Sequence, residues 1–203
     1  MFAQVIQGRT SDAEGLSAAL DRWVQDLAPG SIGWLGSTGG VTDDGRFVAV
    51  VRFESADAAA RNSQRPEQSA WWEETQRLFD GEVTFRDSED VTVDLQGDPE
   101  RAGFVQIMQG RVTDPARAKA LRGEMNTAAM SAMRPDVLGS VSIGHDGGDW
   151  TQVIYFTSEA EAREGEKKEP PPELQATMDE MMKLSVGPPD YFDLRQPMLH
   201  SPG

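Results

Sequence analysis

The chain has 203 residues, of which 19 are basic and 34 acidic, so its formal net charge is −15. This acidic balance argues against binding to nucleic acid, which needs a basic surface, and against docking on anionic lipid. The chain has no cysteine, which excludes disulfides, thiolate nucleophiles and cysteine-ligated metal centres, and it has only two histidines.

The first half of the chain predicts alternating strands and helices. Ser11 and Glu14 form a capping box, and apolar side chains then recur at helical spacing as far as Leu27, before Pro29 ends the pattern. Aspartates and a glycine at 43–45 indicate a hairpin turn. The expected elements are a strand at 2–9, a helix after Ser11, strands at 31–38 and 46–54, helices at 56–62 and 67–79, and a strand or strand pair at 82–95.

The second half predicts the same order of elements. Pro115 suits the first turn of a helix, and Ser158 with Glu161 forms another capping box. Turn residues at 146–149 separate two strands. The expected elements are a strand at 104–111, a helix from Pro115, strands at 137–144 and 150–157, a helix after Ser158, a helix at 171–184 and a strand at 187–194.

An internal repeat organises the chain. Residues 2–12 return as residues 104–114, with the phenylalanine, both glutamines, the glycine, the arginine and the aspartate identical. A polar stretch rich in glycine and proline lies between the copies. We therefore divide the chain into a first repeat at 1–95, a linker at 96–103, a second repeat at 104–194 and a C-terminal tail at 195–203.

The order β-α-β-β-α-β, present twice, predicts an α+β fold built from ferredoxin-like units. Helices cover one face of such a sheet. Where the strands are apolar on both faces, the other face of the sheet must also be buried against another element. We expect the two repeats to pack sheet to sheet as an intramolecular, pseudo-dimeric α/β barrel.

This pattern resembles the dimeric α/β-barrel superfamily. The resemblance covers both copies, and it rests on the order of elements, the repeat length, the duplication and the first-strand endings Gln7-Gly8-Arg9 and Gln109-Gly110-Arg111. Within the superfamily the chain is most similar to proteins related to the antibiotic biosynthesis monooxygenases, which include cofactor-free oxygenases of aromatic polyketides and haem-degrading enzymes. The resemblance implies a fused pseudo-dimer.

The haem-using branches imply residues that this chain replaces or lacks. Haem-degrading members have an asparagine at the end of the first strand, where Gln7 and Gln109 stand here, and a histidine on a helix. No predicted helix contains a histidine, and His145 lies beside a hairpin turn. We therefore expect no haem, no other cofactor and no metal site.

Glutamines and arginines on the first strand of each repeat are candidates for ligand binding. Side chains alternate along a strand, so Gln4 and Gln7 lie on opposite faces, and one glutamine of each copy is expected to face the barrel interior. The Gln7 and Gln109 amides can orient a ligand oxygen, or they can tie strands together. Arg9 and Arg111 can clamp an acidic or enolate-like ligand, or they can form surface ion pairs.

Two aromatic residues complete the candidate set. Trp72 lies next to Trp71 in a predicted helix, where it can line a pocket mouth or pack on the surface. Tyr155 takes the place of Arg52 in the other copy, and it can act as an acid or base or serve the structure. The copies differ most in their second helices, so a single surviving pocket is expected in the first copy.

Two hypotheses about function follow. The first is a cofactor-independent, monooxygenase-like enzyme acting on an apolar aromatic small molecule, with Gln7 and Arg9 polarising a substrate oxygen while Trp72 stacks. The alternative is a non-catalytic small-molecule binder, or a scaffold with a filled barrel. No apolar run is long enough to span a membrane and no signal peptide is evident, so we expect a cytoplasmic protein, either a monomer or a homodimer.

Overall fold

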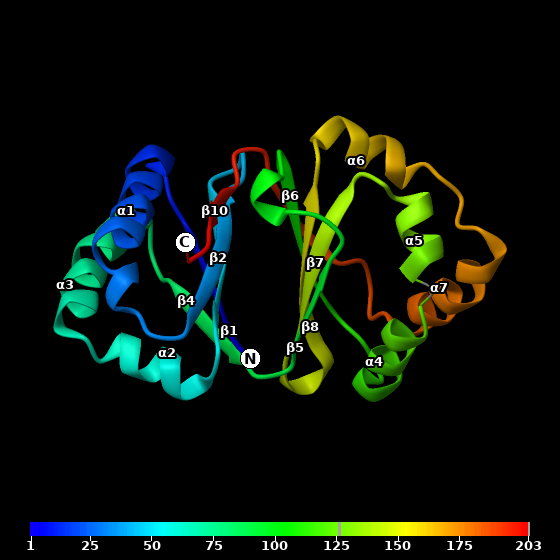
Figure 1. Cartoon of the computed structure of the whole chain (residues 1–203), viewed down its shortest axis with the longest axis horizontal. Coiled ribbons are helices and arrows are strands. Elements are labelled where there is room, and N and C mark those ends of the chain that lie inside the picture. Colours follow the sequence, from blue (N-terminus) through cyan, green and yellow to red (C-terminus); the bar gives the residue numbers. More distant parts are fainter. Residues whose placement is uncertain (126, 203) are drawn as a thin grey trace. The chain divides into compact units, whose positions relative to one another are not determined.

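A computed structural model describes residues 1–125 and 127–202. The chain divides into two compact units. Unit 1 comprises Met1–Val91 together with the C-terminal residues from Gln196, and unit 2 comprises the described part of Thr92–Arg195. Each unit is a five-stranded antiparallel sheet with helices on one face, so the predicted α+β class is confirmed (Figure 1).

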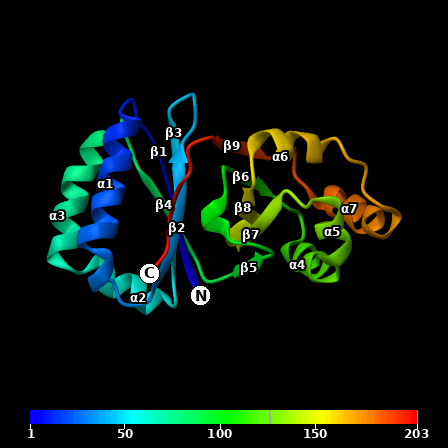
Figure 2. The ribbon, with the colours of Figure 1, turned by 45° about the horizontal axis from the view of Figure 1, so that its top comes forward.

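Unit 1 contains three helices over one sheet. The elements are β1 (Phe2–Arg9), α1 (Ala13–Asp26), β2 (Trp34–Val41), β3 (Arg46–Phe53), α2 (Ala56–Ser63), α3 (Pro66–Thr75), β4 (Thr84–Ser88) and β10 (Met198–His200). The strand order is β10-β2-β3-β1-β4. Figure 2 shows α1 and α3 side by side over the same face of this sheet.

Unit 2 repeats this architecture, with four helices among its described residues. The elements are β5 (Val91–Leu95), β6 (Phe104–Arg111), α4 (Pro115–Glu124), α5 (Thr127–Met133), β7 (Val137–Gly144), β8 (Asp149–Phe156), α6 (Glu159–Glu166), α7 (Pro172–Leu184) and β9 (Asp190–Leu194). The strand order is β5-β7-β8-β6-β9, which matches that of unit 1 position by position. Without its fifth strand, each sheet has the strand order of a ferredoxin-like unit. The packing of the two sheets against each other stays a prediction.

The fifth strand of each sheet comes from outside the sequence repeat that supplies the other four strands. β5 follows β4 in the sequence but pairs with β7 of unit 2, and β10 follows β9 but pairs with β2 of unit 1. The compact units are therefore offset from the sequence repeats at 1–95 and 104–194. The segment that we predicted to be a tail contains a strand of unit 1.

Helix starts follow local capping chemistry, with one correction. Ser158 accepts a hydrogen bond from the backbone of Glu161, as predicted, and Ser55 caps α2 in the same way. The predicted cap of α1 is wrong: Asp12 holds that position, and its carboxylate accepts from Gly15 N at 2.8 Å. The Ser11 hydroxyl instead lies 3.3 Å from a carboxylate oxygen of Asp80.

The second strand begins three residues later than predicted. A 3₁₀ turn at Ala28–Gly30 follows α1, and Gly33 then adopts a φ of +81°, a region that favours glycine. The chain straightens only at Trp34, and a bulge between Trp34 and Gly36 follows directly. This turn delivers the Trp34 side chain to the helix-covered face of the sheet, where it belongs to a buried cluster with Trp23 and Phe53.

Candidate functional site

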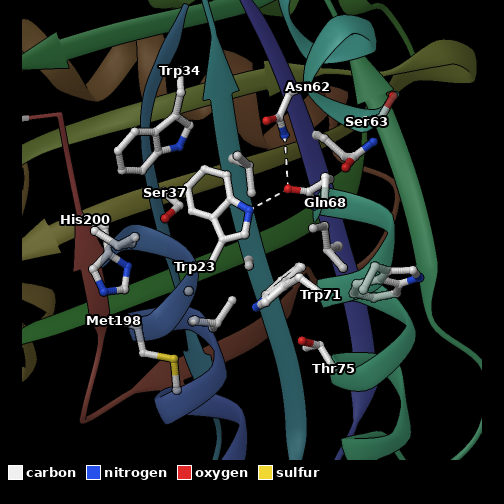
Figure 3. Close-up of a pocket in the computed structure, with 18 of the residues that line it drawn as sticks. Trp23, Trp34, Ser37, Asn62, Ser63, Gln68, Trp71, Thr75, Met198 and His200 are labelled. Atoms are coloured by element: carbon white, nitrogen blue, oxygen red, sulfur yellow. Dashed lines mark hydrogen bonds between the residues drawn. The ribbon is translucent and has the colours of Figure 1, made fainter. Parts of the chain in front are cut away.

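A cavity of about 310 Å³ lies between the helices of unit 1 and its sheet (Figure 3). Its lining side chains come from α1, α2, α3 and all five strands of this unit. The wall is rich in aromatic residues, which are Trp23, Trp34, Phe47, Phe53, Trp71, Trp72, Phe79 and Phe85. A concave, mostly apolar site with a few polar groups is the usual form of a small-molecule pocket.

The tryptophans are held by edge-to-face and tilted ring contacts. Trp23 on α1 meets Trp34 on β2, with ring centroids 5.2 Å apart and planes at 71°. Trp71 on α3 lies 6.4 Å from Trp23 and 6.1 Å from Trp72, and Trp72 contacts Phe85 on β4 at 5.2 Å. This chain of rings fixes the aromatic wall, because each ring restrains the orientation of the next.

Two of these indoles satisfy their N–H groups within the protein. Trp23 Nε1 donates to Gln68 Oε1 at 2.6 Å, and Trp71 Nε1 donates to the Ala19 carbonyl at 3.0 Å. Asn62 Nδ2 also approaches Gln68 Oε1, at 3.4 Å (Figure 3). The Gln68 amide is thus oriented by donors from two helices.

Trp34 differs, because its Nε1 is buried and has no hydrogen-bond partner among the described residues. The residue is only 6% exposed, and Figure 3 shows its ring nitrogen on the side turned toward Trp23. Leaving a buried donor unpaired costs about 1–3 kcal/mol. The wall of the cavity therefore contains a buried donor that no described residue satisfies.

His200 is the one ionisable side chain among the described residues that line the cavity. It reaches the site on β10, where it pairs with Ser37 of β2. Its Nε2 lies 3.0 Å from Asp21 Oδ1 on α1. Among the described residues, no group of three or more histidine, aspartate or glutamate side chains is arranged to hold a metal ion.

Of the six site residues named from the sequence, Trp72 lines this cavity. Gln4 also lines it, and its Nε2 donates to Asp87 Oδ1 at 2.8 Å, so Gln7 points to the opposite face of the sheet. Arg9 is exposed, and its Nη2 donates to the Asp44 carbonyl at 2.6 Å. The pKa of Asp44 is lowered by the Thr42 hydroxyl and by the neighbouring guanidinium of Arg46.

The other three lie in unit 2. Gln109 Nε2 donates to Thr151 Oγ1 at 3.2 Å, which is a tie between β6 and β8. Arg111 is paired with Asp149 at 2.6 Å, a contact that raises the pKa of the arginine by hydrogen bonding and charge attraction. Tyr155 is 2% exposed and is the residue before last in β8. As ligand-binding residues, all six stay predictions.

Charged side chains pack over the sheet of unit 2 beneath α6. Arg163 lies over the Phe104 ring at 5.2 Å and bonds to the Asp193 carboxylate, which also accepts from Gln106 Nε2. Gln106 and Asp193 pair across β6 and β9 as Gln4 and Asp87 do in unit 1. In the sequence alignment of the copies, Arg163 stands where unit 1 has Ala60. The Arg163 side chain therefore covers this part of the sheet in unit 2, whereas unit 1 has an aromatic cavity between its helices and its sheet.

Sequence reasoning missed Trp34, Gln68 and His200 as members of this site. Trp34 was one aromatic residue in a predicted strand, and no local signal marks a donor that packing leaves unpaired. His200 lies in a strand of three residues between two prolines, which is too short for a periodic pattern.

The chain is similar to known proteins in structure but not in sequence. No family model matches the chain, and no curated protein matches it either. Among solved structures, a candidate monooxygenase from Lactobacillus acidophilus is 15% identical, with a TM-score of 0.76, over 98% of this chain and 96% of that one. A candidate monooxygenase from Fusobacterium nucleatum is 10% identical, with a TM-score of 0.75, over 100% and 94%.

An anthrone oxidase-like protein is also similar, at 12% identity and a TM-score of 0.66 over 98% of this chain and 92% of that one. These matches run through both units. The chain therefore shares its ferredoxin-like fold with these proteins. The resemblance that the sequence suggested is confirmed at the level of the fold.

A shared fold does not define the reaction, because one fold hosts many functions. Two of the similar solved structures are named as candidate monooxygenases. No helix among the described residues is long and apolar enough to cross a membrane.

Proposed function

We propose that unit 1 of this dimeric α/β-barrel protein binds a neutral, aromatic molecule that carries a carbonyl group, and oxygenates it without a cofactor. The observation that carries the proposal is the buried, unpartnered Trp34 Nε1 in an aromatic cavity of about 310 Å³. The similarity to candidate monooxygenases and to an anthrone oxidase-like protein supports the choice of reaction.

The cavity supplies binding energy chiefly by excluding water. A flat ligand that buries roughly 200 Å² of apolar surface gains about 5 kcal/mol from this effect. The rings of Trp23, Trp71 and Trp72 offer stacking and edge contacts to such a ligand. Specificity for a carbonyl group comes from the Trp34 donor, because a ligand without an acceptor leaves that donor unpaired.

The proposed reaction needs only the substrate and dioxygen. A methylene group beside an aromatic carbonyl system, as in anthrone, loses two hydrogens and gains one oxygen atom, becoming a carbonyl. The second oxygen atom leaves as water, so dioxygen is the sole oxidant. Hydrogen bonding from Trp34 to the existing carbonyl stabilises the negative charge that develops when the methylene proton departs.

A non-catalytic binding protein is the second candidate. It is favoured by the lining of the cavity, in which the described residues include no aspartate, glutamate, lysine or arginine. Binding and turnover therefore have to be measured separately.

The test compares anthrone with anthracene, which has the same ring system but lacks the carbonyl. We expect anthrone to quench tryptophan fluorescence and Trp34→Phe to weaken its binding about tenfold, since the variant removes one neutral hydrogen bond. Anthracene binding is expected to stay unchanged in Trp34→Phe. Trp150→Phe alters a tryptophan of unit 2 and is the matched control.

Oxygen consumption by wild-type protein with anthrone, above the uncatalysed rate, separates the enzyme from the binding protein. Binding without consumption leaves the second candidate. If neither ligand binds, or if Trp34→Phe weakens both equally, the proposed role of the cavity and of Trp34 is wrong.

A further inference from the structure

The cavity of unit 1 receives a histidine from the far end of the chain. β10 adds to the edge of this sheet through Met198, Leu199 and His200, which pair with residues of β2. His200 and Met198 both line the cavity, and Figure 3 shows them on the side opposite Trp71 and Thr75. An imidazole thus faces an aromatic pocket with no other ionisable group among its described lining residues.

The imidazole is oriented by a carboxylate. His200 Nε2 lies 3.0 Å from Asp21 Oδ1, although 179 positions separate the two residues in the sequence. The His200 side chain is 16% exposed, whereas that of Asp21 is 54% exposed. When Nε2 donates its proton to this carboxylate, the lone pair of the neutral ring is on Nδ1. A base whose tautomer is set by a third group is a recurring catalytic arrangement.

In the other histidine of the chain, Nε2 lies beside a hydroxyl group. His145 Nε2 lies 3.0 Å from the hydroxyl of Thr151 in unit 2, and that hydroxyl also accepts from Gln109. The strand of unit 2 equivalent to β10 is β5, with the sequence Val-Thr-Val-Asp-Leu, which contains no histidine. The histidine–carboxylate pair beside an aromatic cavity is therefore a feature of unit 1 and of its C-terminal strand.

We infer that His200, oriented by Asp21, takes a proton from the aromatic molecule bound in unit 1. The inference rests on the proposed function, and it assigns to that site a proton acceptor that sequence reasoning did not find. In the step, the substrate C–H or O–H bond breaks and an N–H bond forms at His200 Nδ1. The electron pair stays on the substrate as an enolate or phenolate, and Asp21 balances the charge of the imidazolium.

A hydroxyanthraquinone such as alizarin tests this step apart from oxygenation. It carries carbonyl groups and an ionisable phenol, and its visible absorption moves to longer wavelength when the phenol ionises. At a pH below the transition of the free dye in water, we expect wild-type protein to bind alizarin in the ionised form. His200→Gln is expected to lower the ratio of ionised to neutral bound dye about tenfold or more. His145→Gln is the matched control and leaves the ratio unchanged.

Asp21→Asn provides a second variant that keeps His200 in place. Asp21 is an exposed helix residue, so this change leaves the fold intact, and we expect the ionised fraction of bound dye to fall by about threefold. Asp26→Asn makes the same charge change at the end of α1 and is expected to have no effect. If His200→Gln fails to fold, the comparison of Asp21→Asn with Asp26→Asn decides the question.

The outcomes separate the two proposals. Dye that binds wild-type protein only in its neutral form overturns the assignment of His200 and leaves the binding site standing. The same conclusion follows if His200→Gln and Asp21→Asn both retain the full ionised fraction. Dye that does not bind wild-type protein overturns the proposed function and this inference together.

Discussion

The two units have the same strand order, but they differ in how individual polar groups are satisfied. Trp34 Nε1 in unit 1 is buried without a partner among the described residues, whereas the Arg163 guanidinium of unit 2 is bonded to Asp193 over the sheet. Burying an unpaired donor is unfavourable, and a paired cation over an aromatic ring is not. At this scale unit 1 has an unsatisfied donor in the wall of its cavity, whereas unit 2 has a satisfied ion pair over its sheet.

The start of α1 allows a prediction at the residue scale. Asp12 caps the helix through Gly15 N, while Ser11 makes only the long contact with Asp80. We expect Asp12→Ala to lower the free energy of unfolding by about 1 kcal/mol, and Ser11→Ala to change it by only a few tenths. Urea unfolding followed by circular dichroism measures both. Equal losses for the two variants would show that the cap is misassigned.

Helices of unit 2 are joined by ion pairs rather than by aromatic rings. Arg117 on α4 contacts Glu180 on α7 at 2.7 Å and Glu124 on its own helix at 2.9 Å. Arg117 lowers the pKa of Glu180 below its ordinary value of 4.5, chiefly through hydrogen bonds to the carboxylate. The pairing of α4 and α7 therefore depends on pH.

The sign of that dependence follows from the lowered pKa. A carboxylate with a depressed folded-state pKa contributes stability above its unfolded pKa, and this is lost as pH falls through the folded value. We expect Arg117→Gln to destabilise the protein at about pH 7, and this deficit to be smaller at about pH 3. Arg122→Gln, the same charge change on the same helix, is the control. An equal deficit at both pH values would contradict the assignment.

At the scale of the whole molecule, strand exchange ties the two halves of the sequence together. Each sheet receives its fifth strand from the segment that follows the fourth strand of the other sheet. Neither sequence repeat therefore contains all the strands of one compact unit. Removing half of the chain leaves an unpaired edge on β2 or on β7, and exposed edges promote association.

Expression of residues 1–95 alone tests this organisation. The fragment lacks β10, so β2 becomes an open edge, and it also ends with β5, which has lost its partner β7. We expect the fragment to dimerise or aggregate in size-exclusion chromatography. A fragment that adds 196–203 through a short flexible linker restores β10, and we expect it to associate less. A stable monomer of 1–95 would contradict the importance of the exchanged strands.

Much of the fold was predictable because its signals are local. Alternating and helical periodicity, the caps at Ser55 and Ser158 and the proline at the start of α4 each act within a few residues. Together with the order of elements they predict ferredoxin-like units. The cap at Asp12 was missed because adjacent serine and aspartate both suit that position, and only the path of the chain distinguishes them.

The sequence by itself determined the α+β class, the order of elements and the near-symmetry of the two halves, since these follow from patterns along neighbouring residues. Only the tertiary structure decided that β10 completes the sheet of unit 1 and that Trp34, Gln68 and His200 meet around one cavity. The physical reason is that these contacts join residues far apart in the chain, so their energies depend on packing that no local pattern records.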